Sequence, residues 1–303
     1  MKISNKVVQF LVFTFVISYS LAIAYGMIRG GSANDRIGFT VMAAVYMFIP
    51  FVSALIVKKI HKEPLLSNLS ISFKINRWFF AAWLIFPVIV FCSIGVGVML
   101  PGISYNPDMT GMFSRFDGLV PPEAAEEFKN KLDSLPVPYF VLVLAQALIA
   151  GITVNAVAAF GEEAGWRGFL LKEFKDMRFL KASLIIGFIW GIWHAPLILM
   201  GHNYPQHPRI GVLMMIVLCI LLTPIMQYLV IKSKSVISAA IAHGTMNAIS
   251  GISIMACSGG NDLITGMPGA AGFITLLIFN ALLLVYDSFI SKEKIMMSPL
   301  ASA

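Results

Sequence analysis

Long runs of apolar residues follow one another along this chain, with polar segments between them. A helix of about 20 apolar residues crosses the hydrocarbon core of a bilayer, whereas the strands of a transmembrane barrel would show short alternating segments. The pattern therefore predicts an all-α fold, a polytopic transmembrane helical bundle. The eight expected spans are about 7–28, 38–57, 78–100, 138–161, 182–200, 210–231, 236–256 and 271–290.

The composition is that of a membrane protein and excludes an ordinary soluble globular chain. Hydrophobic residues make up 58% of the 303 residues, charged residues only 12%, and the mean hydropathy is +0.84. A charged side chain at bilayer depth costs about 3 kcal/mol or more. Each charged residue that adjoins or enters an expected span is therefore a candidate for function.

Basic residues are distributed unevenly among the expected loops. If both termini are cytoplasmic, sixteen Lys and Arg residues lie on the cytoplasmic side and six on the other side. The sixteen are Lys2, Lys6, Lys58, Lys59, Lys62, Lys74, Arg77, Arg167, Lys172, Lys175, Arg178, Lys181, Lys232, Lys234, Lys292 and Lys294. The six are Arg29, Arg36, Arg115, Lys129, Lys131 and Arg209. Cytoplasmic loops carry an excess of basic residues. We therefore expect both termini in the cytoplasm, and we attribute the net charge of +7 to orientation in the lipid bilayer and not to a nucleic-acid partner.

Two loops are long enough to hold structure of their own. In the basic segment 58–77, we expect the apolar side chains of Leu65, Leu66, Leu69, Ile71 and Phe73 to rest against lipid headgroups. In the acidic, Pro-rich segment 101–137, Glu123 to Leu135 has helical composition, with Phe128, Leu132 and Leu135 on one apolar edge. This stretch is either a short extracytoplasmic helix that shields or gates a cavity, or a solvated loop.

The first polar motif stands at the end of the fourth expected span and contains Glu162, Glu163 and Arg167. Helical spacing allows Glu163 and Arg167 to form an i,i+4 ion pair, and it turns Glu162 by about 100° toward a different neighbour. One carboxylate can then be tied to arginine while the other exchanges a proton with water. The bland alternative is a cluster of charges that snorkels at a helix end.

Two further motifs lie in the fifth and seventh expected spans. Trp190 precedes His194 by one helical turn, and His243 precedes Asn247 by one turn, so each pair shares a helix face. Taken singly, each histidine is compatible with a packed, hydrogen-bonded core position or with interhelical packing. Together with the glutamates and arginine, they indicate one polar pocket shared between helices.

The combined pattern Glu-Glu-x-x-x-Arg, aromatic-x-x-x-His and His-x-x-x-Asn resembles the CPBP family of intramembrane proteases. That family includes the eukaryotic CAAX prenyl endopeptidase and many bacterial Abi-type proteins. The resemblance covers about residues 140–256 and agrees with the count of eight spans. Trp190 is a departure, because the family more often has phenylalanine there. On this basis we divide the single membrane domain into N-terminal spans and loops (1–137), a CPBP-like catalytic core (138–256) and a C-terminal span and tail (257–303).

The resemblance implies a role for each residue. Glu162 would activate a water molecule for attack on a peptide carbonyl, and His194 would assist. His243 and Asn247 would stabilise the oxyanion, while Glu163, Arg167 and the aromatic wall at Trp190 would order the site. These roles are chemically compatible, because a carboxylate can act as a general base and buried polar donors stabilise a developing negative charge.

A zinc-dependent alternative uses Glu162, His194 and His243 as ligands, since a bound zinc ion also activates water. The chain lacks a His-Glu-x-x-His motif, and we expect no cofactor and no metal. The spacing of Cys92, Cys219 and Cys257 has no metal-site pattern either. His202 and His207 lie in a Pro-containing turn and are left out of the site.

Three functions remain in competition. The first is an intramembrane endopeptidase in the cytoplasmic membrane of a bacterium, acting on a peptide or protein substrate that can itself be membrane-anchored. The second is a proton-coupled transporter, because intramembrane Glu and His residues also carry protons; against it, no internal repeat is visible. The third is a bacteriocin-immunity or scaffold membrane protein that keeps the pocket without turnover.

Overall fold

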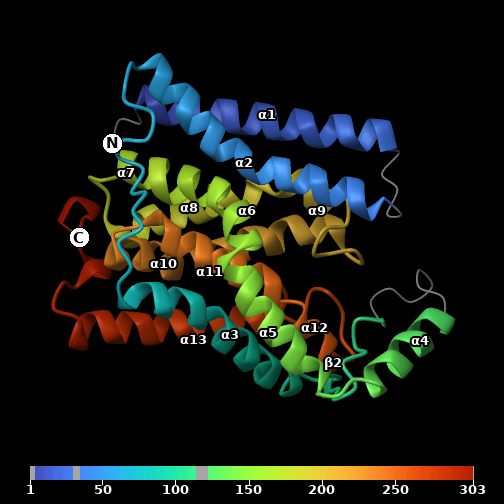
Figure 1. Ribbon diagram of the computed structural model, residues 1–303. Helices are drawn as coiled ribbons and strands as arrows, with labels where there is room; N and C mark the ends of the chain where they lie inside the picture. Colours follow the sequence, from blue (N-terminus) through green and yellow to red (C-terminus); the bar gives the residue numbers. More distant parts are fainter. Residues whose placement is uncertain (1–3, 30–34, 114–121, 303) are drawn as a thin grey trace.

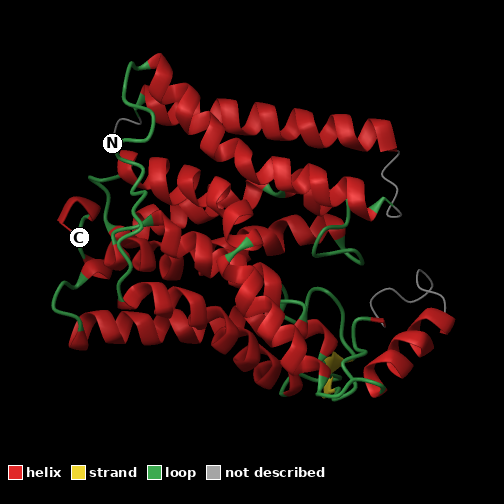
Figure 2. Cartoon of the chain, viewed as in Figure 1, coloured by secondary structure: helices red, strands yellow, loops and turns green. Residues whose placement is uncertain are grey.

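The computed structural model describes residues 4–29, 35–113 and 122–302, and nearly all of its regular structure is helical (Figure 2). The helices are α1 (Asn5–Arg29), α2 (Arg36–Ile60), α3 (Arg77–Val98), α4 (Pro122–Asp133), α5 (Tyr139–Ile152), α6 (Val154–Glu163), α7 (Leu171–Glu173), α8 (Phe179–Trp193), α9 (Ala195–Leu199), α10 (Pro208–Ser233), α11 (Val236–Ile249), α12 (Ile252–Met255) and α13 (Ala270–Val285). A π-helical segment, Ala164–Leu170, continues α6, and another, Tyr286–Ile290, continues α13. Two short strands, β1 (Ser104–Tyr105) and β2 (Cys257–Ser258), pair antiparallel.

The protein is a polytopic helical bundle, as the apolar pattern predicts. Five described helices are long and apolar enough to span a bilayer, namely those at 5–28, 37–60, 77–98, 208–233 and 270–290. The pair α5 and α6 forms a sixth candidate span, bent by 49°. The expected spans 182–200 and 236–256 correspond to α8 with α9 and to α11 with α12, each interrupted by a short break. The total of eight crossings stays a prediction.

The three interrupted spans carry all three polar motifs. The break between α5 and α6 falls at Thr153, whose backbone departs from helical geometry (φ −120°, ψ −106°). The break between α8 and α9 falls at His194, and Pro196 follows in the first turn of α9, where its missing N–H costs nothing. Irregular backbone inside a membrane is tolerated where protein buries it or where it lines a cavity. The interruptions therefore mark the region in which a wet site can form.

Helix α11 lies inside the bundle and packs against α3, α5, α6 and α10. Gly244 permits its closest approach: a Cβ atom at this position would lie 2.6 Å from the backbone nitrogen of Ala156 and 2.8 Å from the carbonyl oxygen of Gly151. A glycine on a helix face allows either another helix or a substrate to approach closely. In the structure, the neighbour is the backbone of α5 and α6.

The bundle has two distinct ends (Figure 1). At the first, which we call the terminus end, lie the start of α1, the loop 61–76, α7 and the C-terminal segment. At the second, which we call the far end, lie α4, the β1–β2 pair and the loop between α9 and α10. An even number of crossings places both termini on one side of a membrane, which agrees with this arrangement. Of the basic residues counted above, Lys2 and Arg115 lie outside the described residues.

The two long loops differ in how well they were predicted. Helix α4 confirms the helix expected over 123–135, and Phe128 packs edge-on against Tyr139 with ring centroids 5.8 Å apart. The loop 61–76 departs from expectation at Leu69, which is 1% exposed. Its carbonyl oxygen would lie 2.9 Å from a Cβ at Gly168. Leu69 is thus part of the protein core and does not rest against headgroups, because the small glycine leaves room for this loop.

Candidate active site

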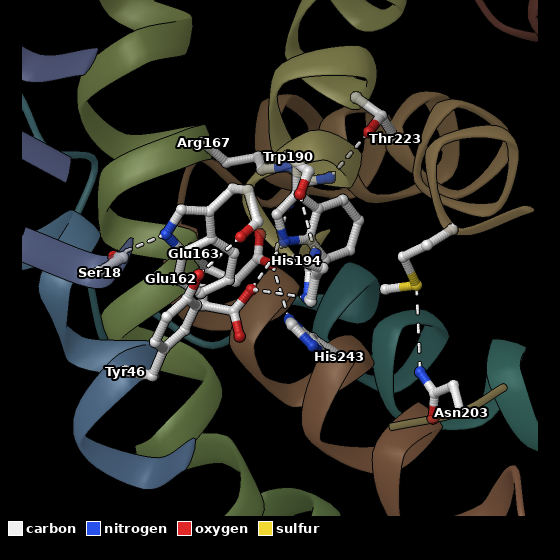
Figure 3. A network of polar contacts seen from close by, with 12 residues as sticks. Ser18, Tyr46, Glu162, Glu163, Arg167, Trp190, His194, Asn203, Thr223 and His243 are labelled. Carbon is white, nitrogen blue, oxygen red and sulfur yellow. Dashed lines mark hydrogen bonds and ion pairs between the residues drawn. The ribbon is translucent and has the colours of Figure 1, made fainter. Parts of the chain in front are cut away.

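A cavity of about 390 Å³ lies among α2, α6, α8, α10 and α11. Five of the residues singled out in the sequence line it, which confirms that the three motifs meet at one pocket. Figure 3 shows Glu162, Trp190, His194 and His243 gathered there. These lining residues are Glu162, Trp190, His194, His243 and Asn247. Glu163 and Arg167 stand behind the pocket wall, both fully buried.

Glu162 lies on the wall of the cavity with 2% of its surface exposed. Its Oε2 accepts a hydrogen bond of 2.7 Å from the indole Nε1 of Trp190. The same oxygen lies 4.0 Å from Nε2 of His194. A buried carboxylate needs such donors because desolvation penalises its charge. Trp190 is therefore more than the aromatic wall that the sequence suggests, since it fixes the orientation of the Glu162 carboxylate.

Glu163 faces a separate set of partners. Its Oε1 accepts from Nη1 of Arg167 at 3.0 Å, which confirms the expected i,i+4 pair, and it also contacts Nδ1 of His243 at 2.9 Å. Arg167 continues the network by donating to Oγ1 of Thr223 at 2.9 Å. Its guanidinium lies 4.2 Å from the ring centre of Trp190, a cation–π contact. This buried network holds α6, α8, α10 and α11 in register.

The hydrogen bonds indicate how the two histidine rings are oriented. Nδ1 of His194 lies 2.8 Å from the carbonyl oxygen of Trp190, an acceptor, so Nδ1 carries the proton and Nε2 presents a lone pair toward Glu162. Nδ1 of His243 likewise donates to the Glu163 carboxylate. Asn247 lies one turn further along α11, where it is exposed to the cavity. The His243–Glu163 contact is not anticipated by the sequence, which assigns Glu163 to Arg167 alone.

The backbone immediately after the glutamates is wider than an α-helix. Ala164–Leu170 forms a π-helical segment, and all seven of its residues are buried. Such segments are rare and occur frequently at functional sites. The ion pair between Glu163 and Arg167 forms although Arg167 lies in this wider segment. The i,i+4 spacing of an ideal α-helix therefore predicts the correct contact, even though the backbone here is π-helical.

Three polar residues of this network, Ser18, Tyr46 and Thr223, carry no motif and were missed. Tyr46 of α2 lines the cavity and donates its hydroxyl to the carbonyl oxygen of Trp193 at 2.6 Å. Trp193 in turn donates from its indole to Ser18 of α1 at 2.8 Å. Thr223 binds Arg167 as described. The only available signal was a polar side chain inside an apolar run, which is common in membrane helices.

The zinc alternative requires Glu162, His194 and His243 to bind one metal ion. Among the described residues, no three His, Cys, Asp or Glu side chains are grouped so that they could hold a metal ion. Nδ1 of His243 is engaged by Glu163 and Oε2 of Glu162 by Trp190, as the outer contacts of a metal ligand also would be, so the cleavage assay with a chelator decides between the two mechanisms. His207 of the α9–α10 loop pairs with buried Asp262 (Nδ1 to Oδ1, 2.6 Å), which accounts for this histidine without a metal. The residues of the pocket can activate water without a metal ion.

Comparison with known proteins gives two consistent results. Residues 143–249 match the family model described as type II CAAX prenyl endopeptidase Rce1-like. The chain is also 24% identical over 202 residues to CAAX prenyl protease 2 of Methanococcus maripaludis. That alignment covers 63% of this chain and 62% of the relative, so the chain spans less than two thirds of the length of this curated relative. The matched region contains the three polar motifs, and its limits fall within the stretch 138–256 expected as a core, whose boundaries stay a prediction.

The family match and the named relative both agree with the resemblance that the motifs carry, and the fold agrees with a multi-pass membrane protein. Residues 143–249 are similar to the Rce1-like family, and this likeness supports the assignment of the chain to the CPBP family of proteases.

Proposed function

We propose that this protein is an intramembrane endopeptidase that hydrolyses a peptide bond with a water molecule activated by Glu162. The carrying observation is the convergence of two acceptors on one cavity, the Glu162 carboxylate and the Nε2 lone pair of His194, 4.0 Å apart. A water molecule between them can donate one proton to each. It then presents its oxygen to a carbonyl group in the cavity.

The hydrolysis needs only residues of this chain and one water molecule. Glu162 takes a proton as the water oxygen attacks the carbonyl carbon, and a tetrahedral oxyanion forms. The C–N bond then breaks, and Glu162 returns its proton to the departing amine. His194 holds the attacking water from its Nε2. Trp190 keeps the carboxylate aimed at this water through the 2.7 Å indole bond.

We assign stabilisation of the oxyanion to residues of α11 that line the cavity. Asn247 offers its side-chain N–H groups, and His243 offers Nε2–H when its ring carries both protons. Glu163 supports that charged ring from Nδ1, and Arg167 fixes Glu163 in turn. Donors that are already oriented inside a low-dielectric cavity stabilise developing negative charge strongly. This division gives each polar residue of the three motifs a distinct task at one pocket.

The surroundings favour proteolysis over a proton relay. Toward the terminus end, fully buried Leu170 of the π-helical segment and Met226 of α10 follow the polar network, so the network meets an apolar layer. Toward the cavity, apolar walls such as Leu197 and Leu218 suit a peptide with large apolar side chains. The name of the relative, a prenyl protease, supports a protein substrate in the same way. We place the chain in the cytoplasmic membrane of a bacterium, with both termini inside, on the distribution of basic residues.

A cleavage assay tests this function. Purified protein in detergent is incubated with a library of internally quenched peptides, alone and with a chelator. We expect cleavage that the chelator leaves unchanged, with thermal stability monitored in parallel. Loss of cleavage to the chelator at unchanged stability would contradict the metal-free mechanism. Absence of cleavage, together with proton-coupled flux in liposomes, would favour the transporter. The third alternative has its own outcome. If no peptide were cleaved, and cells with Glu162→Gln stayed as resistant to a bacteriocin as cells with the wild type, an immunity or scaffold role would be favoured.

A further inference from the structure

The cavity has one closed side and one open side. Its lining extends from Glu162 to the loop residues His202 and Asn203, which join α9 and α10 at the far end of the bundle. Residues that follow α11 and precede α13, including Gly251 and Pro268, line the same side. The side chain of His202 is exposed. The mouth of the pocket is therefore at the far end.

The side of the cavity toward the terminus end is sealed by protein. Trp166 and Arg167 of the π-helical segment are fully buried, as are Leu170 and Thr223. The buried ion pair of Arg167 with Glu163 adds polar contacts to this seal. A polypeptide cannot reach Glu162 through this layer without unpacking it, and unpacking would leave a buried charge unpaired.

The rim of the mouth is a built structure. Tyr204 donates its hydroxyl to the carbonyl oxygen of Pro268 at 2.7 Å, which joins the two loops at the mouth. Buried Asp262 accepts from the backbone nitrogens of Gln206 and His207 at 2.7 and 3.2 Å. These bonds hold the loops beside the opening and do not cross the site itself.

Charge assigns the two ends to the two sides of the membrane. The basic residues that dominate the positive-inside count lie at the terminus end, for example Lys58, Lys172 and Lys234 around a second cavity there. Cytoplasmic ends carry this excess. The far end, where the catalytic pocket opens, is accordingly extracytoplasmic.

The chemistry of the lining narrows the substrate further. Among the described residues that line the cavity, Glu162 is the only carboxylate, and there is neither lysine nor arginine. Its apolar part includes Met47, Met215 and Met246, flexible side chains that adapt to varied apolar groups. A free peptide carboxyl terminus would find no lysine or arginine in this pocket, and the ring of His243, which the mechanism charges, is already assigned to the oxyanion. An internal, uncharged stretch of chain fits it better.

We propose that the substrate is an internal apolar segment of a polypeptide presented from the extracytoplasmic side, such as an exported or membrane-anchored protein. This proposal rests on the proposed endopeptidase function. Cleavage would then occur on the side of the membrane opposite both termini of the enzyme.

Thiol labelling tests the direction of access. In a Cys92→Ser background, where Cys219 and Cys257 are buried, Asn203→Cys reports on the mouth and exposed Lys175→Cys reports on the terminus end. Intact spheroplasts are treated with a membrane-impermeant maleimide. We expect labelling of the Asn203→Cys variant in intact spheroplasts, and of the Lys175→Cys variant only after permeabilisation. The reverse pattern would overturn the proposed access.

Sealed vesicles test the substrate. A membrane-impermeant quenched peptide with an internal apolar segment is supplied to right-side-out and to inverted vesicles, with free or amidated carboxyl terminus. We expect cleavage by right-side-out vesicles, loss of cleavage in inverted ones, and equal rates for the two termini. Cleavage by inverted vesicles alone, or dependence on a free carboxylate, would overturn the proposal. No cleavage even in detergent would overturn the endopeptidase function and the substrate with it, whereas the labelling would still decide the face of access.

Discussion

At the scale of residues, two adjacent glutamates have different surroundings. Successive helical residues point about 100° apart, so Glu162 faces the cavity, Trp190 and His194, while Glu163 faces Arg167 and His243. The first carboxylate is held beside a space that water can enter. The second is engaged through its Oε1 by Arg167 and His243. Sequence neighbours thus supply one group for chemistry and one for support.

Trp190→Phe tests whether the indole bond positions the base. The substitution keeps an aromatic ring near Arg167 and removes the 2.7 Å donor to Glu162. A hydrogen bond to a charged group contributes about 1.5–3 kcal/mol, which corresponds to a roughly ten- to hundredfold lower kcat, with KM little changed. Trp83→Phe is the matched control, because it removes an indole donor to the Leu148 carbonyl outside the cavity. Equal losses of kcat in both variants would contradict a positioning role.

The sequence predicts part of this site and misses the rest for a physical reason. The Glu163–Arg167 pair follows from local helical spacing, and the shared pocket follows from the cost of several polar groups in apolar spans. The contact of His243 with Glu163 joins positions 80 residues apart, and Tyr46 enters from a helix without a motif. Both depend on how whole helices pack. The spacing of residues along one helix does not determine how that helix packs against the others.

At the scale of elements, the interrupted helices determine where the site lies. Apolar periodicity predicts where a membrane is crossed, because length and hydropathy suffice for that. It does not predict the break at Thr153 or the π-helical segment after Glu163, since neither changes the hydropathy of its run. Tight packing around α11 then brings the broken helices together.

Gly244→Ala tests that packing. The added methyl group would meet backbone atoms of α5 and α6 at 2.6–2.8 Å, and the backbone cannot move aside as a side chain can. Overpacking of this kind typically costs about 1–3 kcal/mol, so the thermal midpoint in detergent should fall. Gly95→Ala in α3 is the control, because nothing lies within 4 Å of its added Cβ. A midpoint for Gly244→Ala at or above that of the control would show that the helices are less closely packed there.

At the scale of the whole molecule, the terminus end is tied together by charge. Glu63 of the loop 61–76 binds Lys6 of α1 and Lys58 of α2, the latter at 3.1 Å and with Lys58 only 2% exposed. The hydrogen bond from Lys6 holds the pKa of the Glu63 carboxyl below its usual value of 4.5. These contacts connect the first two helices on the side that we assign to the cytoplasm.

Acid should loosen this connection. A carboxyl whose pKa is lowered on folding contributes stability that is complete above its ordinary pKa and is lost as the pH falls through the lowered value. We expect the thermal midpoint of the wild type to fall as the pH drops below about 4.5. Glu63→Gln should have a lower midpoint at neutral pH and a smaller fall with acid. Exposed Glu126→Gln of α4 serves as the control; an acid response of Glu63→Gln as steep as that of this control would contradict the assignment.

The division of roles between the two glutamates is tested most directly by measuring kcat/KM and the thermal midpoint of Glu162→Gln and Glu163→Gln side by side. Removal of the general base should lower kcat/KM of Glu162→Gln by about 10²–10⁴-fold, with a midpoint close to that of the wild type. Glu163→Gln should lose stability by about 3–5 kcal/mol, because Arg167 is left as an unpaired buried charge. Wild-type turnover in Glu162→Gln, or an inactive Glu163→Gln of unchanged stability, would contradict the account.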